Sequence, residues 1–197
     1  MSDAHEQLEQ AEHAEHAGES NRTIALVIAI IALFLALSET LGKSAQTHAI
    51  SLNIQASDTW NFFQAKTIRQ TALRTAAEGA ATQLPLAPEG EAKAMMSKQI
   101  AAWLDTAARY ESDPAAKDGR EELRQRAEGL ERERETALHR YHNYELASAA
   151  FQIGIVLCSA AVITGIVMLA WLAGGVAVLG IAFMAIGLFV PELMQLG

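Results

Sequence analysis

Residues 146–191 read LASAAFQIGIVLCSAAVITGIVMLAWLAGGVAVLGIAFMAIGLFVP, and this stretch decides the fold. It contains no Asp, Glu, Lys, Arg or His. A transmembrane helix needs about 20 apolar residues to cross roughly 30 Å of hydrocarbon, so the stretch is long enough for two crossings. Gly174 and Gly175 lie where a tight turn would join them. The sequence therefore predicts a membrane hairpin, with spans at 148–172 and 176–193.

A second apolar segment lies near the start of the chain. Residues 1–21 form an acidic tail rich in Ala, Glu and His, and the apolar residues that follow predict a first span at 22–41. A cleaved signal peptide needs a basic region before its apolar core, and here that region is acidic except for Arg22. We therefore expect a retained span.

The polar segment at 42–147 predicts long helices. Residues 44–81 contain no Pro, and the sequence QLPLAPEG at 83–90 then interrupts the helix. A shorter helix is expected at 91–110, and a third begins near Asp118. The third helix carries apolar residues at heptad spacing and i,i+4 ion pairs, which is typical of a coiled coil. The two long helices should lie antiparallel, with the middle helix across or beside their tip.

The predicted fold is therefore all-α. It has three transmembrane helices and a long antiparallel, coiled-coil-like helical stalk between spans one and two. The lipid bilayer is the first expected partner, because a chain with three apolar segments of this length has no other place to bury them.

Three short motifs resemble a known family. The tail reads EHAEHA at 12–17, the first span ends in SET at 38–40, and SDTWNFFQAK follows at 57–66. They resemble the bacterial membrane family known as domain of unknown function 4337, and the resemblance covers most of the chain. It implies a three-span bacterial membrane protein and brings no established activity. The most specific part of the resemblance supplies these candidate residues: Asp58, Trp60, Asn61, Phe62, Phe63, Gln64 and Lys66.

This motif has two interpretations. Trp60, Phe63 and Ile68 are typical of a helix core or of a seam between subunits. The alternative is a polar site formed by the hydrophilic side chains of the same segment: Asp58, Asn61, Gln64 and Lys66. Their spacing specifies no chemistry.

Glu39 is the acidic residue closest to a predicted span. It is either an interfacial carboxylate paired with Lys43 one helical turn away, or an ion or proton site. The second interpretation is open because carboxylates within the membrane are costly and usually functional.

The histidines fall into two groups. His48, His139 and His142 should lie at a similar height near the membrane, where they are either interfacial anchors or a pH-sensing or metal cluster. The tail group is either a solvated helix face or a metal site, and it consists of Glu9, Glu12, His13 and His16.

A stripe of small residues runs along the second span: Ala150, Gly154, Cys158, Ala161 and Gly165. Small residues let membrane helices approach closely. The stripe packs either within the chain, where Gly180 and Gly187 offer a partner face, or against a second subunit. Cys158 is the only cysteine, so no intrachain disulfide is available, and its apolar surroundings predict a structural thiol.

The absence of common catalytic motifs is the main sequence evidence on function. The sequence contains no Gly-x-Gly-x-x-Gly, P-loop, Gly-x-Ser-x-Gly or His-Glu-x-x-His motif, so we expect no enzymatic activity and no cofactor. The intermixed charges of the polar segment argue against nucleic-acid binding. The heptads and the small-residue stripe instead favour a self-associating scaffold or an element that docks an unidentified protein partner. The alternative is an oligomeric ion or proton conductor with Glu39 near the path.

Orientation follows from the basic residues near the span ends. The tail side offers only Arg22, whereas the stalk side offers Lys43, Arg132, Arg134 and Arg140. Cytoplasmic segments carry an excess of Lys and Arg. We therefore expect a multi-pass protein of the bacterial inner membrane, with a cytoplasmic stalk and the tail outside.

Overall fold

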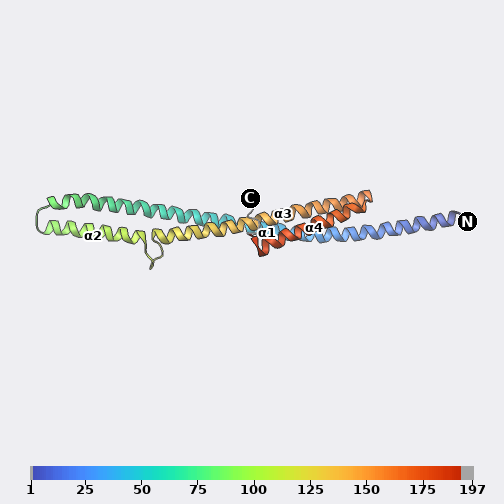
Figure 1. Cartoon of the computed structure of the whole chain (residues 1–197), viewed down its shortest axis with the longest axis horizontal. Helices are drawn as coiled ribbons and strands as arrows, with labels where there is room; N and C mark the ends of the chain where they lie inside the picture. Colours follow the sequence, from blue (N-terminus) through green and yellow to red (C-terminus); the bar gives the residue numbers. More distant parts are fainter. Residues whose placement is uncertain (1, 192–197) are drawn as a thin grey trace. The chain divides into compact units, whose positions relative to one another are not determined.

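The computed structural model describes the backbone of residues 2–191 and the side chains of residues 22–191. In this part of the chain it consists of four α-helices and one short 3-10 turn (Figure 1). Their bounds are α1 Ser2–Gln83, η1 Leu84–Leu86, α2 Glu91–Glu111, α3 Arg120–Thr164 and α4 Val167–Phe189. The predicted all-α class is confirmed for these residues. The chain divides into two compact units, which we call the apolar unit (Met1–His48 with Thr136–Gly197) and the polar unit (Ala49–Glu135).

Three helices are long and apolar enough to cross a membrane. They are α1 from Arg22 onward, α3 and α4. Large apolar side chains cover their outer surfaces, including Leu33, Ile163 and Trp171. In water such surfaces are unfavourable, whereas lipid tails solvate them well.

The core of the apolar unit forms around Phe151 of α3, which is fully buried. Its ring stacks on Phe34 of α1 with centroids 6.0 Å apart. From α4, Gly180 faces the same ring so closely that a Cβ atom there would lie 2.7 Å from Cε1 of Phe151. One aromatic side chain therefore joins all three apolar helices.

The turn between α3 and α4 differs from the predicted position. The expected turn at Gly174 and Gly175 is wrong, because both residues lie inside α4. The chain turns instead at Gly165, whose φ of +70° is accessible to glycine without strain. Thr164 assists, since its hydroxyl donates to Ala160 O (2.7 Å) and accepts from Ile166 N (3.4 Å). The predicted spans at 148–172 and 176–193 are therefore displaced.

The polar unit brings the second part of α1 together with α2 and the start of α3. The helix breaks fall where the sequence predicts them, at Gln83 and between Glu111 and Arg120. As the residue number rises along α1, the number of the contacting partner falls, from α3 through the loop before it to α2. The four pairs are Asn53–Arg134, Trp60–Glu131, Lys66–Asp118 and Gln70–Glu111. Within this unit α2 therefore lies beside α1, one of the two positions expected for the middle helix.

Small and aliphatic side chains fill the space between these helices. The buried ones include Leu52, Ala56 and Ala77 on α1, Ala107 on α2, and Leu123 and Ala127 on α3. Ile68, which we expected in a core or seam, is 70% exposed and lies outside this core. Ile68 lies on the side of α1 away from the buried Leu52 and Ala56, so its position on the helix rather than its hydrophobicity decides its exposure.

Candidate functional site

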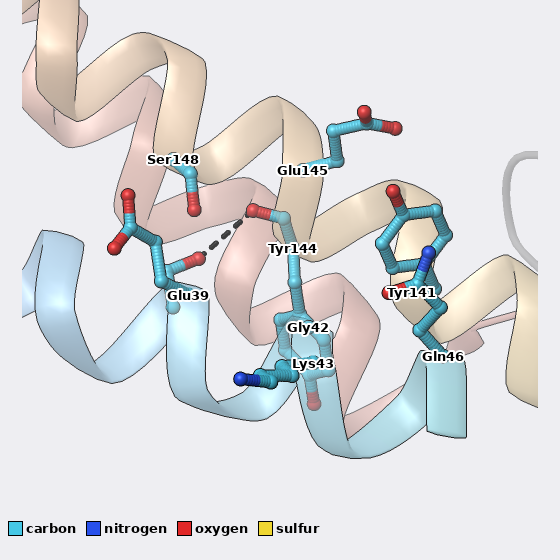
Figure 2. Close-up of a pocket in the computed structure, with 9 residues that line it drawn as sticks. Glu39, Gly42, Lys43, Gln46, Tyr141, Tyr144, Glu145 and Ser148 are labelled. Carbon is cyan, nitrogen blue, oxygen red and sulfur yellow. Dashed lines mark hydrogen bonds between the residues drawn. The ribbon is translucent and has the colours of Figure 1, made fainter. Parts of the chain in front are cut away.

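An open groove of about 330 Å³ lies between α1 and α3 in the apolar unit. Figure 2 shows it with Glu39 and Lys43 on successive turns of α1, opposite Tyr141, Tyr144 and Ser148 of α3. We call it the Glu39 groove. Its full lining is Ser38, Glu39, Gly42, Lys43, Gln46, Tyr141, Tyr144, Glu145 and Ser148.

Two close contacts hold the walls of the Glu39 groove together. The buried Ser38 hydroxyl donates to the carbonyl oxygen of Tyr144 at 2.9 Å (Figure 2). Gly42 brings the helices near enough that a Cβ atom there would lie 3.4 Å from the Cβ of Tyr144. A hydrogen bond to a buried helical carbonyl both satisfies the hydroxyl and fixes the spacing of the two helices.

Glu39 itself is exposed at the edge of the groove. Its carboxylate accepts a hydrogen bond of 3.4 Å from Nε2 of Gln152, a residue of the apolar part of α3. The expected ion pair with Lys43 is not among the pairs formed by the described side chains. The groove can therefore offer a carboxylate, an ammonium and hydroxyl groups to a polar ligand, but it does not enclose one.

The histidines are not gathered into a metal site. His48 and His142 are exposed, and Nδ1 of His142 lies 3.9 Å from Oε2 of Glu145. His139 is half-buried. Among the side chains of residues 22–191, no group of three or more His, Cys, Asp or Glu is placed to hold a metal ion. The tail candidates Glu9, Glu12, His13 and His16 lie outside the described side chains.

The family-like motif divides between two faces of α1. Trp60, Phe63 and Lys66 turn toward α2 and α3, and the rings of Trp60 and Phe63 meet edge to face at 5.5 Å. Nε1 of Trp60 donates to Oε1 of Glu131 at 2.8 Å. The remaining residues of the motif are exposed: Asp58, Asn61, Phe62 and Gln64. The motif therefore supplies a helix contact through Trp60, Phe63 and Lys66, while Asn61 and Gln64 lie on an uncovered surface and Asp58 and Phe62 line an open hollow beside α3.

Lys66 is the most buried charged residue of this motif, at 5% exposure. Its ammonium lies 2.8 Å from Oδ2 of Asp118. It also lies 5.3 Å from the centroid of Phe62 and 5.4 Å from that of Tyr110. A carboxylate and two aromatic faces together replace the water that a buried ammonium loses.

One turn further along α1, Gln70 forms the centre of a second polar cluster. Its amide donates to Ala107 O (3.0 Å) and to Oε2 of Glu111 (2.6 Å), and its oxygen accepts from Arg120 (2.6 Å). The amide of Gln70, then Arg120 and Arg74, hold the pKa of Glu111 below its ordinary value. Sequence reasoning missed this cluster, because its members are far apart in the chain and only the four-residue step from Lys66 to Gln70 hinted at it.

The small-residue stripe of α3 faces the other apolar helices along most of its length. Gly154 touches both neighbours, since a Cβ atom there would lie 3.5 Å from Ala173 O and 3.6 Å from Cδ1 of Ile31. Cys158 and Ala161 are buried, Ala150 is half-buried, and Gly165 forms the turn instead of continuing the stripe. On α4, Gly187 meets Tyr144 at 3.1 Å in the same way.

Comparison with known proteins adds the family and nothing on activity. The family model described as domain of unknown function (DUF4337) matches residues 20–190. No curated protein and no solved structure matches the chain. The match runs from the first apolar segment to the end of α4, and includes both the Glu39 groove and the Trp60–Lys66 motif. The chain therefore belongs to the family of domain of unknown function 4337.

Proposed function

We propose that the protein is a non-enzymatic, multi-pass protein of a bacterial inner membrane, which self-associates and acts as a scaffold or docks a partner protein. In this proposal α1, α3 and α4 cross the bilayer. The polar unit forms an antiparallel helical stalk in the cytoplasm, and the tail lies outside. The charge asymmetry between Arg22 on one side and Lys43 and Arg140 on the other supports this orientation.

One observation carries the proposal: the family-like motif is used for helix packing. Trp60 is bonded to Glu131, Lys66 to Asp118, and the neighbouring Gln70 to Glu111 and Arg120. A catalytic or ligand site would instead leave such polar groups facing a cavity. The Trp60 indole and the Lys66 ammonium tie α1 to α3 and to the loop before it, which suits a long helical scaffold.

The test is the protein mass of the detergent-purified full-length chain, measured by light scattering with the detergent contribution subtracted. We expect one defined oligomer at protein concentrations that span at least tenfold. A clean monomer over this range would remove self-association from the proposal.

A second candidate function rests on the contact between Glu39 and Gln152. Two polar side chains from α1 and α3 meet at 3.4 Å in segments that are otherwise apolar. Polar groups at membrane depth often mark ion or proton paths. If the oligomer conducts, reconstituted liposomes should show a proton or cation flux that Glu39→Gln abolishes. Glu78→Gln, which changes a glutamate of the polar unit, should leave the flux unaltered, and absence of any flux in the unmodified protein would rule this function out.

A further inference from the structure

The face of α1 that points away from α2 and α3 is uncovered and carries exposed isoleucines among uncharged polar residues. On the inward face, Leu52, Ala56 and Ala77 are buried. On the opposite face, Ile50, Ile54 and Ile68 are 57%, 55% and 70% exposed. These three isoleucines lie on roughly the opposite side of the helix from the buried residues, because an α-helix turns 100° per residue.

The uncovered face has heptad spacing. Ile54, Asn61 and Ile68 follow one another at intervals of seven residues. The flanking positions are uncharged: Ser57, Gln64 and Ala65 lie between them, and Thr71 and Ala72 follow. A helix face that meets only water normally carries Lys, Glu and Arg. In this register the a positions are Ile54, Asn61 and Ile68, and the d positions are the uncharged polar residues Ser57, Gln64 and Thr71. Ile with one Asn among the a positions is found in helices that pair with another helix.

Asn61 identifies the second helix as a copy of the first. A single Asn among apolar core positions pairs with the equivalent Asn of a parallel partner, and it fixes the alignment at some cost in stability. With an apolar partner at this height, the buried amide would have no hydrogen bond. An identical chain supplies the matching amide at the matching height.

Charges at the border of this face support a parallel arrangement. In a parallel coiled coil, the g residue just before an a position faces the e residue of the partner helix, which is five positions further along the sequence. Asn53 would thus face Asp58 of the second copy. Asn53 Oδ1 accepts from Arg134 at 3.1 Å, and Nε of Arg134 is buried with no hydrogen-bond partner in the described part of the chain.

Asp58 and Arg134 complement each other across such a pair. Asp58 is exposed, and neither residue has an ion pair with any other described side chain. The other outward border positions, Ala65 and Ala72, are uncharged and introduce no like charges. We propose that Ile50, Ile54, Asn61 and Ile68 of α1 form a seam along which a second copy of this chain pairs in parallel, with Asp58 of each copy beside Arg134 of the other. This inference rests on the proposed self-association and names its surface.

Cysteine cross-linking of the full-length chain tests the seam. Cys158→Ser provides a background without cysteine, since Cys158 is the only one. In this background, we expect Asn61→Cys and Ile54→Cys each to give a disulfide-linked dimer under mild oxidation in native membranes. Gln55→Cys is the matched control: position 55 is exposed but lies off the seam, so no dimer should form.

Each other outcome is informative. An oligomer by light scattering with no cross-link at 54 or 61 would overturn the seam and leave self-association intact. A monomer by light scattering would overturn both. Antiparallel pairing would give a different pattern: Asn61→Cys would cross-link, Ile54→Cys would not, and a mixture of Ile54→Cys and Ile68→Cys chains would cross-link with each other. This pattern would overturn the parallel arrangement. Equal cross-linking of Gln55→Cys would show random collision.

A charge exchange tests the border contact separately. Asp58→Lys should reduce cross-linking at Asn61→Cys, because it places an ammonium beside Arg134 of the other copy. Adding Arg134→Glu to the same chain should restore it. If Asp58→Lys leaves the cross-linking yield unchanged, the proposed contact between Asp58 and Arg134 is wrong.

Discussion

At the scale of single residues, close approach and burial decide which positions tolerate change. Glycines on α3 and α4 differ sharply in their surroundings although the sequence presents them as one apolar pattern. Gly180 lies against a buried ring, whereas Gly174 and Gly175 have no heavy atom within 4 Å of a built Cβ. A small residue in a membrane helix therefore supports packing only where a neighbour fills the space beside it.

Gly180→Ala should destabilise the apolar unit. The added methyl group would lie 2.7 Å from Cε1 of Phe151, and this ring cannot move away because it is fully buried. Overpacking of this kind costs about 1–3 kcal/mol. Thermal loss of helicity in detergent, followed by circular dichroism, provides the measurement. Gly175→Ala is the control, with no loss expected, and equal midpoints for the two variants would contradict the contact.

The pair Lys66 and Asp118 should be asymmetric to mutation. Asp118→Ala leaves a buried ammonium without its carboxylate, and we expect a loss of about 1–2 kcal/mol, less than for a fully buried pair because Asp118 is 43% exposed. Lys66→Met fits the same aromatic surroundings without a charge and should cost less. In the Lys66→Met background, Asp118→Ala should then have almost no effect. Additive losses in chemical unfolding of the full-length chain would show that the two residues are not coupled.

At the scale of helices, the sequence predicts breaks well where polar turn residues mark them. QLPLAPEG ends α1 and Asp113–Pro114 lies in the loop before α3, as expected. The sequence predicts the turn between α3 and α4 at Gly174 instead of Gly165, because hydropathy does not distinguish these two glycines. The decisive difference is the conformation at Gly165 and the hydroxyl of Thr164 beside it. Long-range pairs such as Gln70 with Arg120 also cannot be predicted from sequence patterns, because they depend on how α2 and α3 are joined.

Gly165→Ala tests the observed turn. The position has φ of +70°, and a side chain there costs about 1 kcal/mol or more even though no atom obstructs it. Gly174→Ala should be neutral or slightly stabilising, because alanine is the better helix former. The thermal midpoint of each variant in detergent distinguishes the two positions. A larger decrease in thermal midpoint for Gly174→Ala than for Gly165→Ala would contradict the observed turn and favour a turn at Gly174.

The stability of the polar unit should fall in acid through Glu111. Its pKa is lowered in the folded chain, so its carboxylate contributes stability above the ordinary value of 4.5 and loses that contribution as the pH falls through the folded-state pKa. The side chain is 48% exposed, so we expect about 0.5 kcal/mol. Thermal midpoints between pH 7 and pH 3 should decrease less in Glu111→Gln than in the unmodified chain. If the thermal midpoints of Glu111→Gln and the unmodified chain fall equally with pH, Glu111 does not contribute to the loss of stability in acid.

At the scale of the whole molecule, the proposed crossing by α1 would put the tail and the polar unit on opposite sides of a bilayer. The sequence predicts the helical class and the family from apolar length and from the Trp60–Lys66 motif. It does not predict which face of α1 remains uncovered, because that depends on which side α2 and α3 occupy. Ile68, predicted for a helix core or a seam between subunits, is exposed in the single chain and so lies outside the core of the polar unit.

Membrane topology can be measured by labelling in whole cells. In the Cys158→Ser background, Ser2→Cys should react with a membrane-impermeant maleimide in cells whose outer membrane has been permeabilised. Ala116→Cys, in the exposed loop between α2 and α3, should react only after the inner membrane is disrupted. The reverse pattern would invert the orientation, and labelling of both positions from outside would exclude an odd number of crossings.

The short turn at Gly165 and Ile166 also bears on how the chain enters a bilayer during synthesis. Only these two residues separate α3 from α4, and neither carries a charge. Moving charged loops through a hydrocarbon layer is the expensive part of membrane integration. In the proposed topology, the turn between α3 and α4 has no hydrophilic side chain to carry across the bilayer. If α3 and α4 cross a bilayer as proposed, they should therefore integrate together as a single event.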